Sequence, residues 1–419
     1  MFYSKPSFLK DIGAYDHRLP TNLLRFTKQV MVQYKEPISI FNFLEQAPPD
    51  DKRKQDTLEW VEYFYSVLVS HRTEVLERFY NSYLYTEEME HLFERPLFTE
   101  SIQELEASLL DESEKTIFVQ RKDKLKRLLR NLYAKEMLRD TTITNSIPGK
   151  PNFWESLENF FQGKIDDRLF APSSIRLYLR DKTLQTPIYL LQQYQSKASI
   201  LNPAVLYLLL QTKLKGQRLF TPEMSWSSYL LTFLASDSSW KEYVGVDVMD
   251  SVIQKSKSMV NLYRKKNPNS TKIVTILQRP SESLLHDKSF LSTYSNQMDT
   301  VLYCPPYYDM EIYPDDSGKQ SIDVYPTYEK WLQGYLYPTL MLSITVLRKG
   351  GKLCVLLGNY HKKLSGEIYD LIEDFQSFMK KQNSMKQTDM YFLKNRLSPL
   401  KNNNKLRGEI LFLFTKQTA

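Results

Sequence analysis

The second half of the chain alternates short apolar segments with helical ones, and this alternation restricts the fold more than any other feature. Such a pattern is typical of strand–helix–strand units, in which parallel strands form one sheet with helices on its faces. The expected strands cover 217–221, 243–248, 272–277, 299–303 and 352–357. The expected helices cover 203–213, 226–235, 250–265, 328–347 and 366–381. Residues 390–394 and 409–415 are predicted to form a final antiparallel pair.

The first half has a different pattern, with apolar residues recurring at three- and four-residue steps. This spacing predicts helices over 56–93, 101–110 and 122–138. Residues 141–151 are rich in Thr, Asn, Pro and Gly and are interpreted as a linker. We therefore predict a mainly α-helical N-terminal domain over 1–197 and an α/β domain over 198–419.

Composition excludes several classes of protein. Two cysteines rule out a disulfide scaffold and a Cys-rich zinc site, and the five histidines show no metal-ligand spacing. No apolar stretch reaches the roughly 18 residues of a membrane span, and the N-terminus lacks a signal-peptide pattern. The net charge of +7 allows a nucleic-acid partner. We expect an intracellular, soluble protein, cytoplasmic or nuclear, without a metal.

A diproline ends the strand expected at 299–303. The residues that follow this strand are Cys304, Pro305, Pro306, Tyr307 and Tyr308. Two consecutive prolines cannot continue a ladder of backbone hydrogen bonds, so the strand must stop there. Ligands in open α/β sheets bind at the carboxyl ends of the strands, which predicts an active-site loop at this position.

With this loop the chain resembles the amino-group methyltransferases, which use S-adenosylmethionine to methylate adenine N6 or cytosine N4 in DNA. Their signature is Asp, Asn or Ser followed by Pro-Pro and an aromatic residue, and here it is Cys304-Pro305-Pro306-Tyr307. The continuation to Tyr313 is close to the form in phage and viral members. The resemblance covers about 201–416. It implies a Rossmann-like methyltransferase domain, mostly parallel with a C-terminal antiparallel strand, behind the α-helical domain.

The resemblance also assigns the cofactor residues. Asp247, at the end of its strand, is expected to bind the ribose hydroxyls of S-adenosylmethionine. Ser281 and Glu282 are either neighbours of the cofactor adenine or plain loop residues. The first cofactor loop carries Thr221, Glu223 and Ser225 and departs from the family because it contains no glycine. Glu223 either faces the cofactor ammonium or faces solvent.

In the family, the target amino group donates hydrogen bonds to the first signature residue and to the carbonyl of the first proline. The methyl group is then transferred directly, without a covalent intermediate. Cys304 departs from the signature, which has Asp, Asn or Ser at this position, and a thiol is a weak hydrogen-bond acceptor. Alternatively, Cys304 is a small buried residue at a strand end. Tyr307 is expected to stack on a base flipped out of the duplex.

Nucleic-acid contacts are predicted in three places. Tyr308 follows the catalytic tyrosine, and Arg127 and Arg130 lie on a basic helix. A basic loop near the end of the chain adds Lys394, Arg396, Lys405 and Arg407. Charge runs of this kind are alternatively just solvated faces.

Three functions remain open at this point. The first choice is an enzyme that methylates adenine N6 in DNA. The second is a weak or inactive methyltransferase fold that binds nucleic acid or serves in assembly, and the third is an RNA amino-methyltransferase. The expected partners are nucleic acid, with DNA preferred, and a protein contacting the helical domain, without a membrane or a metal.

Overall fold

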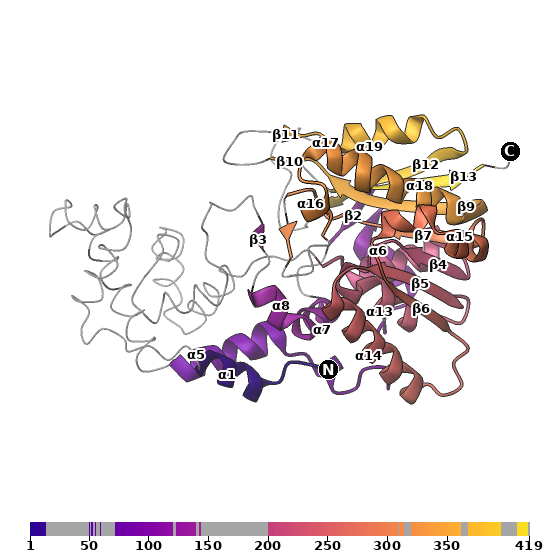
Figure 1. Ribbon diagram of the computed structural model, residues 1–419. Helices are drawn as coiled ribbons and strands as arrows, with labels where there is room; N and C mark the ends of the chain where they lie inside the picture. The colour runs from indigo at the N-terminus through magenta and orange to yellow at the C-terminus, as the bar shows by residue number, and fades with distance from the viewer. Residues whose placement is uncertain are drawn as a thin grey trace.

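In the computed structural model, the described residues are 1–13, 50, 52, 55, 59, 72–119, 123–139, 142–143, 200–309, 311–313, 320–361, 368–394 and 409–417 (Figure 1). Helices and strands from both halves of the chain build one α/β body within these ranges. No helix among these residues is long and apolar enough to cross a membrane.

The centre of the molecule is a nine-stranded sheet in the order β1-β2-β12-β13-β9-β7-β4-β5-β6. Its strands are β1 Leu110–Asp111, β2 Thr116–Phe118, β4 Arg218–Thr221, β5 Glu242–Asp247, β6 Ile273–Gln278, β7 Met298–Tyr303, β9 Leu347–Gly358, β12 Met385–Lys394 and β13 Glu409–Lys416. The run β6-β5-β4-β7-β9 is parallel, and β13 is antiparallel to both β9 and β12. The predicted Rossmann-like class, mostly parallel with a C-terminal antiparallel strand, is confirmed.

The strand order reverses beside β4. The chain proceeds from β4 to β5 and β6 on one side, and then crosses to β7 on the other. A reversal of this kind leaves a crevice at the carboxyl ends of the two strands that flank it, and ligands of open α/β sheets bind there. The topology alone therefore places a binding site at the ends of β4 and β7.

Helices cover both faces of the sheet (Figure 1). Alternate strand residues enter different cores, as the two-residue period of a strand requires: Leu219 belongs to one cluster and Phe220 to the other. The first face is covered by α12 Pro203–Leu209, η4 Leu210–Leu214, α13 Ser228–Ala235 and α14 Asp250–Lys266. The second is covered by η6 Ser281–His286, α15 Lys288–Tyr294, α17 Tyr328–Trp331, η7 Leu332–Leu336, α18 Tyr337–Val346 and α19 Leu371–Lys380.

Part of the described first half packs against this sheet, from Leu92 to Met137. The described helices of the first half are α1 Lys5–Gly13, α5 Arg72–Phe79, η1 Tyr80–Leu84, η2 Glu87–Met89, α6 Ile102–Leu109, α7 Lys124–Leu132 and α8 Ala134–Arg139. Strands β1 and β2 form a hairpin, and β2 pairs in parallel with β12, Thr116 opposite Phe392. Leu128 shares a hydrophobic core with Tyr229 and Leu413 of the second half. The division into two domains at residue 197 stays a prediction.

Several expected elements differ in detail. The helix predicted over 122–138 breaks at Tyr133 into α7 and α8. The helix predicted over 366–381 begins only at Leu371, because β11 Ile368–Tyr369 pairs with β10 Tyr360–His361. Part of the predicted linker is also a strand, because β3 Thr142–Ile143 pairs with β8 Glu311–Ile312. Two-residue strands are too short to show an alternating pattern, so the sequence does not reveal them.

Candidate functional site

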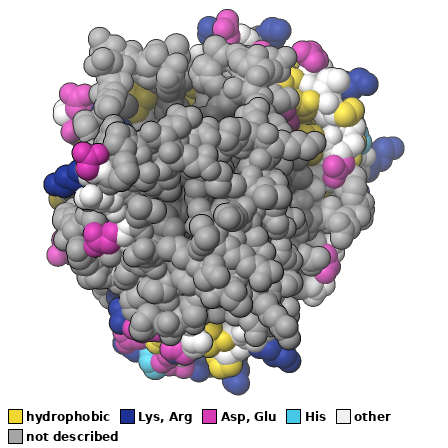
Figure 2. Space-filling view, turned by 90° about the vertical axis from the view of Figure 1, so that its left-hand side faces the viewer, with side chains coloured by type: hydrophobic (Ala, Val, Ile, Leu, Met, Phe, Trp, Pro, Cys, Tyr) yellow, Lys and Arg dark blue, Asp and Glu magenta, His cyan; other side chains and the backbone are white. Residues whose placement is uncertain are grey.

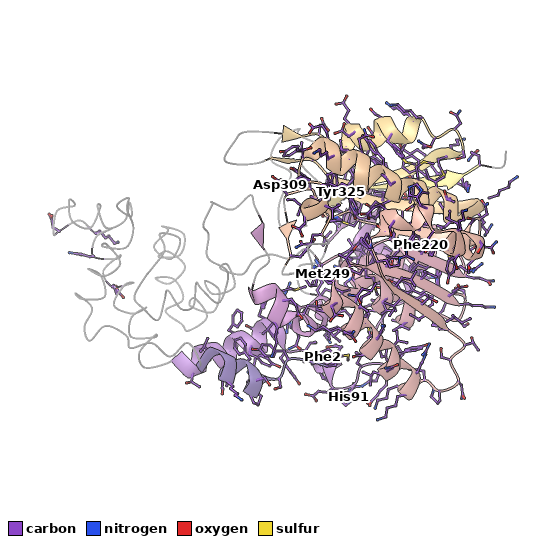
Figure 3. All side chains as sticks on the ribbon, in the orientation of Figure 1. Phe2, His91, Phe220, Met249, Asp309 and Tyr325 are labelled. Atoms are coloured by element: carbon purple, nitrogen blue, oxygen red, sulfur yellow. The ribbon has the colours of Figure 1, made fainter. Side chains whose placement is uncertain are left out.

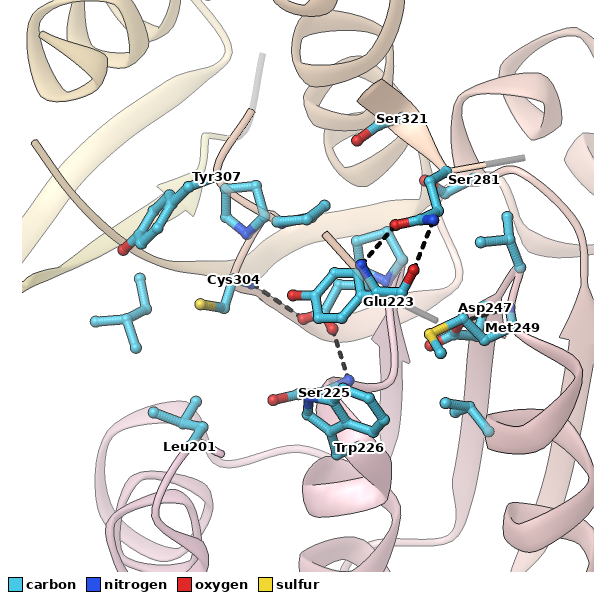
Figure 4. A pocket seen from close by; sticks show the side chains of 18 of the residues that line it. Leu201, Glu223, Ser225, Trp226, Asp247, Met249, Ser281, Cys304, Tyr307 and Ser321 are labelled. Atoms are coloured by element: carbon cyan, nitrogen blue, oxygen red, sulfur yellow. Dashed lines mark hydrogen bonds between the residues drawn. The ribbon is translucent and has the colours of Figure 1, made fainter. Parts of the chain in front are cut away.

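A pocket opens at the edge of the sheet that the topology selects (Figure 4). Its wall includes the residues that directly follow four parallel strands: Pro222 after β4, Val248 after β5, Arg279 after β6 and Cys304 after β7. Figure 3 shows Met249 at this end of the sheet and Phe220 within the sheet. Most residues predicted from the signature motifs line this pocket, namely Glu223, Ser225, Asp247, Ser281, Glu282, Cys304, Pro305, Pro306, Tyr307 and Tyr308.

Thr221 is the predicted cofactor residue that is not part of the pocket wall. It is fully buried, and its hydroxyl lies 2.7 Å from the Tyr243 hydroxyl. As the last residue of β4, it supports the loop from beneath.

Asp247 ties the first cofactor loop to the start of α14. Its carboxylate accepts hydrogen bonds from the backbone N–H of Met224 at 3.3 Å and of Met249 at 3.0 Å. Asp247 also lines the pocket, at the carboxyl end of β5. Its ribose-binding role stays a prediction.

The loop after β4 adopts the backbone that glycine favours, although it contains none. Ser225, Trp226 and Ser227 have φ values of 44°, 51° and 61°. A left-handed conformation costs a residue with a Cβ about 1–2 kcal/mol. The loop therefore takes a glycine-like path at an energetic cost.

Tyr133 holds this strained loop from the first half of the chain. Its hydroxyl forms a buried hydrogen bond with Ser227 Oγ, which also lies 2.6 Å from Ser256 Oγ. The Tyr133 ring packs edge-on against Trp226, with ring centroids 5.2 Å apart, and Trp226 packs in the same way against Tyr313. These contacts stabilise a backbone conformation that local propensity opposes.

Glu223 connects the cofactor loop to the diproline loop, as the dashed lines in Figure 4 show. Its carboxyl accepts hydrogen bonds from Ser225 N at 2.6 Å and Cys304 N at 3.3 Å. Burial, and then the charge of Asp247, raise the pKa of Glu223 to about 8. A ligand cation in the pocket would favour the ionised carboxylate. Glu223 lines the pocket, and its role toward a cofactor ammonium stays a prediction.

The diproline loop divides the pocket. In Figure 4, the Cys304 thiol points toward the side where Leu201 lies, away from Asp247 and Met249. Tyr307, the last residue of the diproline signature, lines the pocket and is 8% exposed. Tyr308, predicted to contact nucleic acid, is 9% exposed, donates a 2.6 Å hydrogen bond to the Pro326 carbonyl and packs against other tyrosines.

Ser281 and Glu282 begin η6, directly after β6. The Ser281 hydroxyl lies 3.2 Å from the Thr339 hydroxyl, and Glu282 accepts a 3.3 Å hydrogen bond from Tyr325. Burial raises the pKa of Glu282. Both residues face the pocket from the β6 side, where the resemblance placed the cofactor adenine.

The described members of the predicted basic contacts are not part of the pocket wall. Arg127 donates to the Tyr85 carbonyl at 3.2 Å, and the Arg130 guanidinium lies 4.1 Å from the ring centroid of Tyr83, so both pack against their own helical region. The Lys394 carbonyl accepts from Val119 N. Arg396, Lys405 and Arg407 lie outside the described residues. The described side chains visible in Figure 2 carry both signs of charge without a large basic patch.

Sequence reasoning missed several residues of the pocket wall, including two charged residues from distant segments. Lys126 of α7 and Glu409 of β13 belong to the wall. Both come from segments far from the signature motifs in sequence, and only the tertiary fold brings them to the site. The basic helix containing Lys126 was a visible signal, but it indicated phosphate contacts rather than a pocket.

No group of three or more His, Cys, Asp or Glu side chains within the described ranges is arranged to hold a metal ion.

Comparison with known proteins gives matches among solved structures alone. No family model and no curated protein matches the chain. TrmN from Thermus thermophilus is 13% identical over 52% of this chain and 49% of its own, so the match spans about half of that protein, with a TM-score of 0.31. An S-adenosylmethionine-dependent O-methyltransferase from Thermotoga maritima is 12% identical over 59% and 72%, with a TM-score of 0.30. The CurJ carbon methyltransferase is 12% identical over 71% and 72%, with a TM-score of 0.34. Such low values assign no activity to this chain.

Proposed function

We propose that this protein is an S-adenosylmethionine-dependent methyltransferase acting on an exocyclic amino group of a nucleic-acid base, with adenine N6 in DNA as the first choice. The observation that supports the proposal most is one pocket at the switch point of the sheet. It holds Asp247 and Glu223 on one side of Cys304 and continues past the diproline loop on the other. Such a pocket suits a reaction between two bound molecules.

The residues near β4, β5 and β6 fit the cofactor. In the proposed role, the Asp247 carboxylate in the pocket wall accepts hydrogen bonds from the ribose hydroxyls, and Glu223 offers a carboxyl for a cationic group. Met249 and Pro280 provide apolar surface for a planar ring. When bound, the cofactor supplies a sulfonium methyl group.

The diproline loop fits the acceptor. Proline has no N–H, and the residues after β7 have left the ladder, so the Pro305 carbonyl is oriented by the loop rather than by the sheet. In the proposed role, this carbonyl accepts a hydrogen bond from the target amino group and fixes its direction. Positioning of this kind supplies much of the rate in a direct transfer. Cys304 contributes less because a thiol is a weak acceptor.

The test begins with cofactor binding. Titration calorimetry with S-adenosylmethionine should show binding to the wild type and a loss of roughly tenfold or more in affinity for Asp247→Asn, since a hydrogen bond to a charged group is lost. Asp250→Asn, three residues along the same segment and exposed, is the control and should bind normally. An absence of binding at millimolar cofactor would refute the proposal.

A second candidate function is a weak or inactive methyltransferase fold that serves in nucleic-acid binding or assembly. Cys304 and the strained, glycine-free loop favour it. Transfer of labelled methyl groups to unmethylated DNA and to RNA, measured for the wild type and for Cys304→Asn, separates the candidates. An enzyme with a suboptimal signature should gain rate from the substitution, whereas an inactive fold should transfer no label in either form. Transfer to RNA tests the third function considered, an RNA amino-methyltransferase.

A further inference from the structure

The pocket has a second, charged end that the signature motifs do not explain. The strand order β12-β13-β9-β7-β4-β5-β6 places Cys304, after β7, between two sets of wall residues. Asp247 and Ser281 follow β5 and β6 on one side. On the other side, apolar side chains form most of the wall, namely Val119, Ile200, Leu201, Leu356 and Leu393. Lys126 and Glu409 complete this end.

Neither charged group has a hydrogen-bonded or ion-paired partner among the described residues. Among the described residues, the Lys126 ammonium and the Glu409 carboxyl have no hydrogen bond and no ion pair, with each other or with any other side chain. Lys126 and Glu409 interact with each other only through longer-range electrostatics. Asp123 and Arg130 act on Lys126 in the same way. Burial lowers the pKa of Lys126 and raises that of Glu409. Partly buried charges without partners destabilise a fold, which suggests that a ligand supplies the missing partners.

The pair of opposite charges limits the chemistry of that ligand. A phosphate would be attracted by Lys126 but repelled by Glu409. An ammonium group would be attracted by Glu409 but repelled by Lys126. A neutral planar group whose edge carries an acceptor beside a donor satisfies both residues, and the apolar walls suit its faces. Adenine and cytosine have such an edge, since a ring nitrogen lies next to the exocyclic amino group.

We propose that Lys126 and Glu409 are specificity-determining residues that bind the edge of a neutral amino-bearing base in this end of the pocket. Lys126 donates a hydrogen bond to an acceptor on the base, and Glu409 accepts one from an N–H group. The inference rests on the proposed function, because it assigns the acceptor of the same reaction. It adds that the first half of the chain, through α7, helps to select the base.

The experiment measures nucleoside binding to the full chain by calorimetry, with adenosine, cytidine and inorganic phosphate as probes. The variants are Lys126→Met and Glu409→Gln. Lys124→Met on the same helix is the matched control, because Lys124 is exposed and pairs with Glu88. We expect adenosine or cytidine to bind, and both pocket variants to lose roughly tenfold or more in affinity. Lys124→Met should bind like the wild type.

Thermal unfolding of the same variants separates binding from a structural role. Removing a buried, unpartnered charge should raise the melting temperature of Lys126→Met and of Glu409→Gln while binding is lost. A fall in melting temperature together with lost binding would mean that the residues support the fold, and would overturn the inference.

Three binding results would also overturn it: no nucleoside binding at millimolar concentration, unchanged binding in both variants, or phosphate binding that Lys126→Met removes. Titration with S-adenosylmethionine tests the proposed function independently. Cofactor binding without nucleoside binding refutes the inference alone, and nucleoside binding without cofactor binding refutes the enzyme alone.

Discussion

Glu223 is the residue whose ionisation the fold changes most clearly within the site. Burial raises the pKa of its carboxyl in the folded protein to about 8, from an ordinary value of 4.5. Between these values the unfolded chain releases the proton while the folded chain keeps it. The contribution of Glu223 to stability therefore falls as pH rises through this window, and is constant below and above it.

We expect Glu223→Gln to remove this decline, because Gln keeps the shape but does not ionise. The free energy of unfolding of the variant, measured with denaturant at several pH values from 5 to 8, should fall less with rising pH than that of the wild type. The exposed Glu373→Gln should keep the wild-type slope. Identical slopes for wild type and Glu223→Gln would show that the carboxyl is not perturbed.

The same residue predicts how cofactor affinity depends on pH. A cationic ligand favours the ionised carboxylate, so the affinity for S-adenosylmethionine should increase as pH approaches about 8 and then level off. Calorimetric titrations across this range should show the increase for the wild type and not for Glu223→Gln. A flat wild-type profile would place the cation of the cofactor away from Glu223.

At the scale of elements, the loop between β4 and α13 combines a glycine-like backbone with bulky side chains. Ser225 adds strain, and its hydroxyl makes no hydrogen bond within the described part of the chain, whereas Trp226 and Ser227 are held by Tyr133. Ser225→Gly should therefore raise the free energy of unfolding by up to about 1 kcal/mol, the strain removed minus the entropy that glycine adds to the unfolded chain.

Ser225→Ala is the control for this change, because alanine removes the hydroxyl but keeps the Cβ that causes the strain. Chemical denaturation should leave its stability close to that of the wild type. If Ala stabilises the protein as much as Gly does, the hydroxyl rather than the backbone conformation is the source of the cost.

The elements that were predicted well from the sequence are those whose apolar residues recur with a clear period. The strands β5, β6 and β7 and the helix α14 were placed within a residue or two, and Asp247 and the diproline loop reached the predicted edge of the sheet. The left-handed turn at Ser225–Ser227 was not predictable, because no glycine marks it. Strands β1 and β2 were missed because they are short and their partner β12 lies far along the chain.

At the scale of the whole molecule, the part of the first half that contains α6 and α7 shares one hydrophobic core with the sheet. Leu128 of α7 is fully buried in this core with residues of α13 and β13. Leu128→Ala should lower the free energy of unfolding by about 2–5 kcal/mol, as expected for a cavity in a packed core. Hydrogen exchange should show that amides of β5 and β7 lose protection together with those of α7.

Lys124→Ala on the same helix is the control, because an exposed ion pair contributes little, and its exchange pattern should match the wild type. Unchanged protection of β5 and β7 in Leu128→Ala would instead mean that the two halves unfold separately.

The position of β13 has a consequence for synthesis of the protein on the ribosome. This strand lies between β9 and β12, yet it follows every other described strand in the chain. Until it emerges, β12 has no neighbour that links it to the parallel strands, so β1, β2 and β12 are not yet joined to the rest of the sheet. Residue Glu409 arrives with the same strand. The nascent chain can thus complete the β5–β6 side of its pocket well before the side that contains Glu409, and an incomplete translation product would leave unpaired strand edges that favour aggregation.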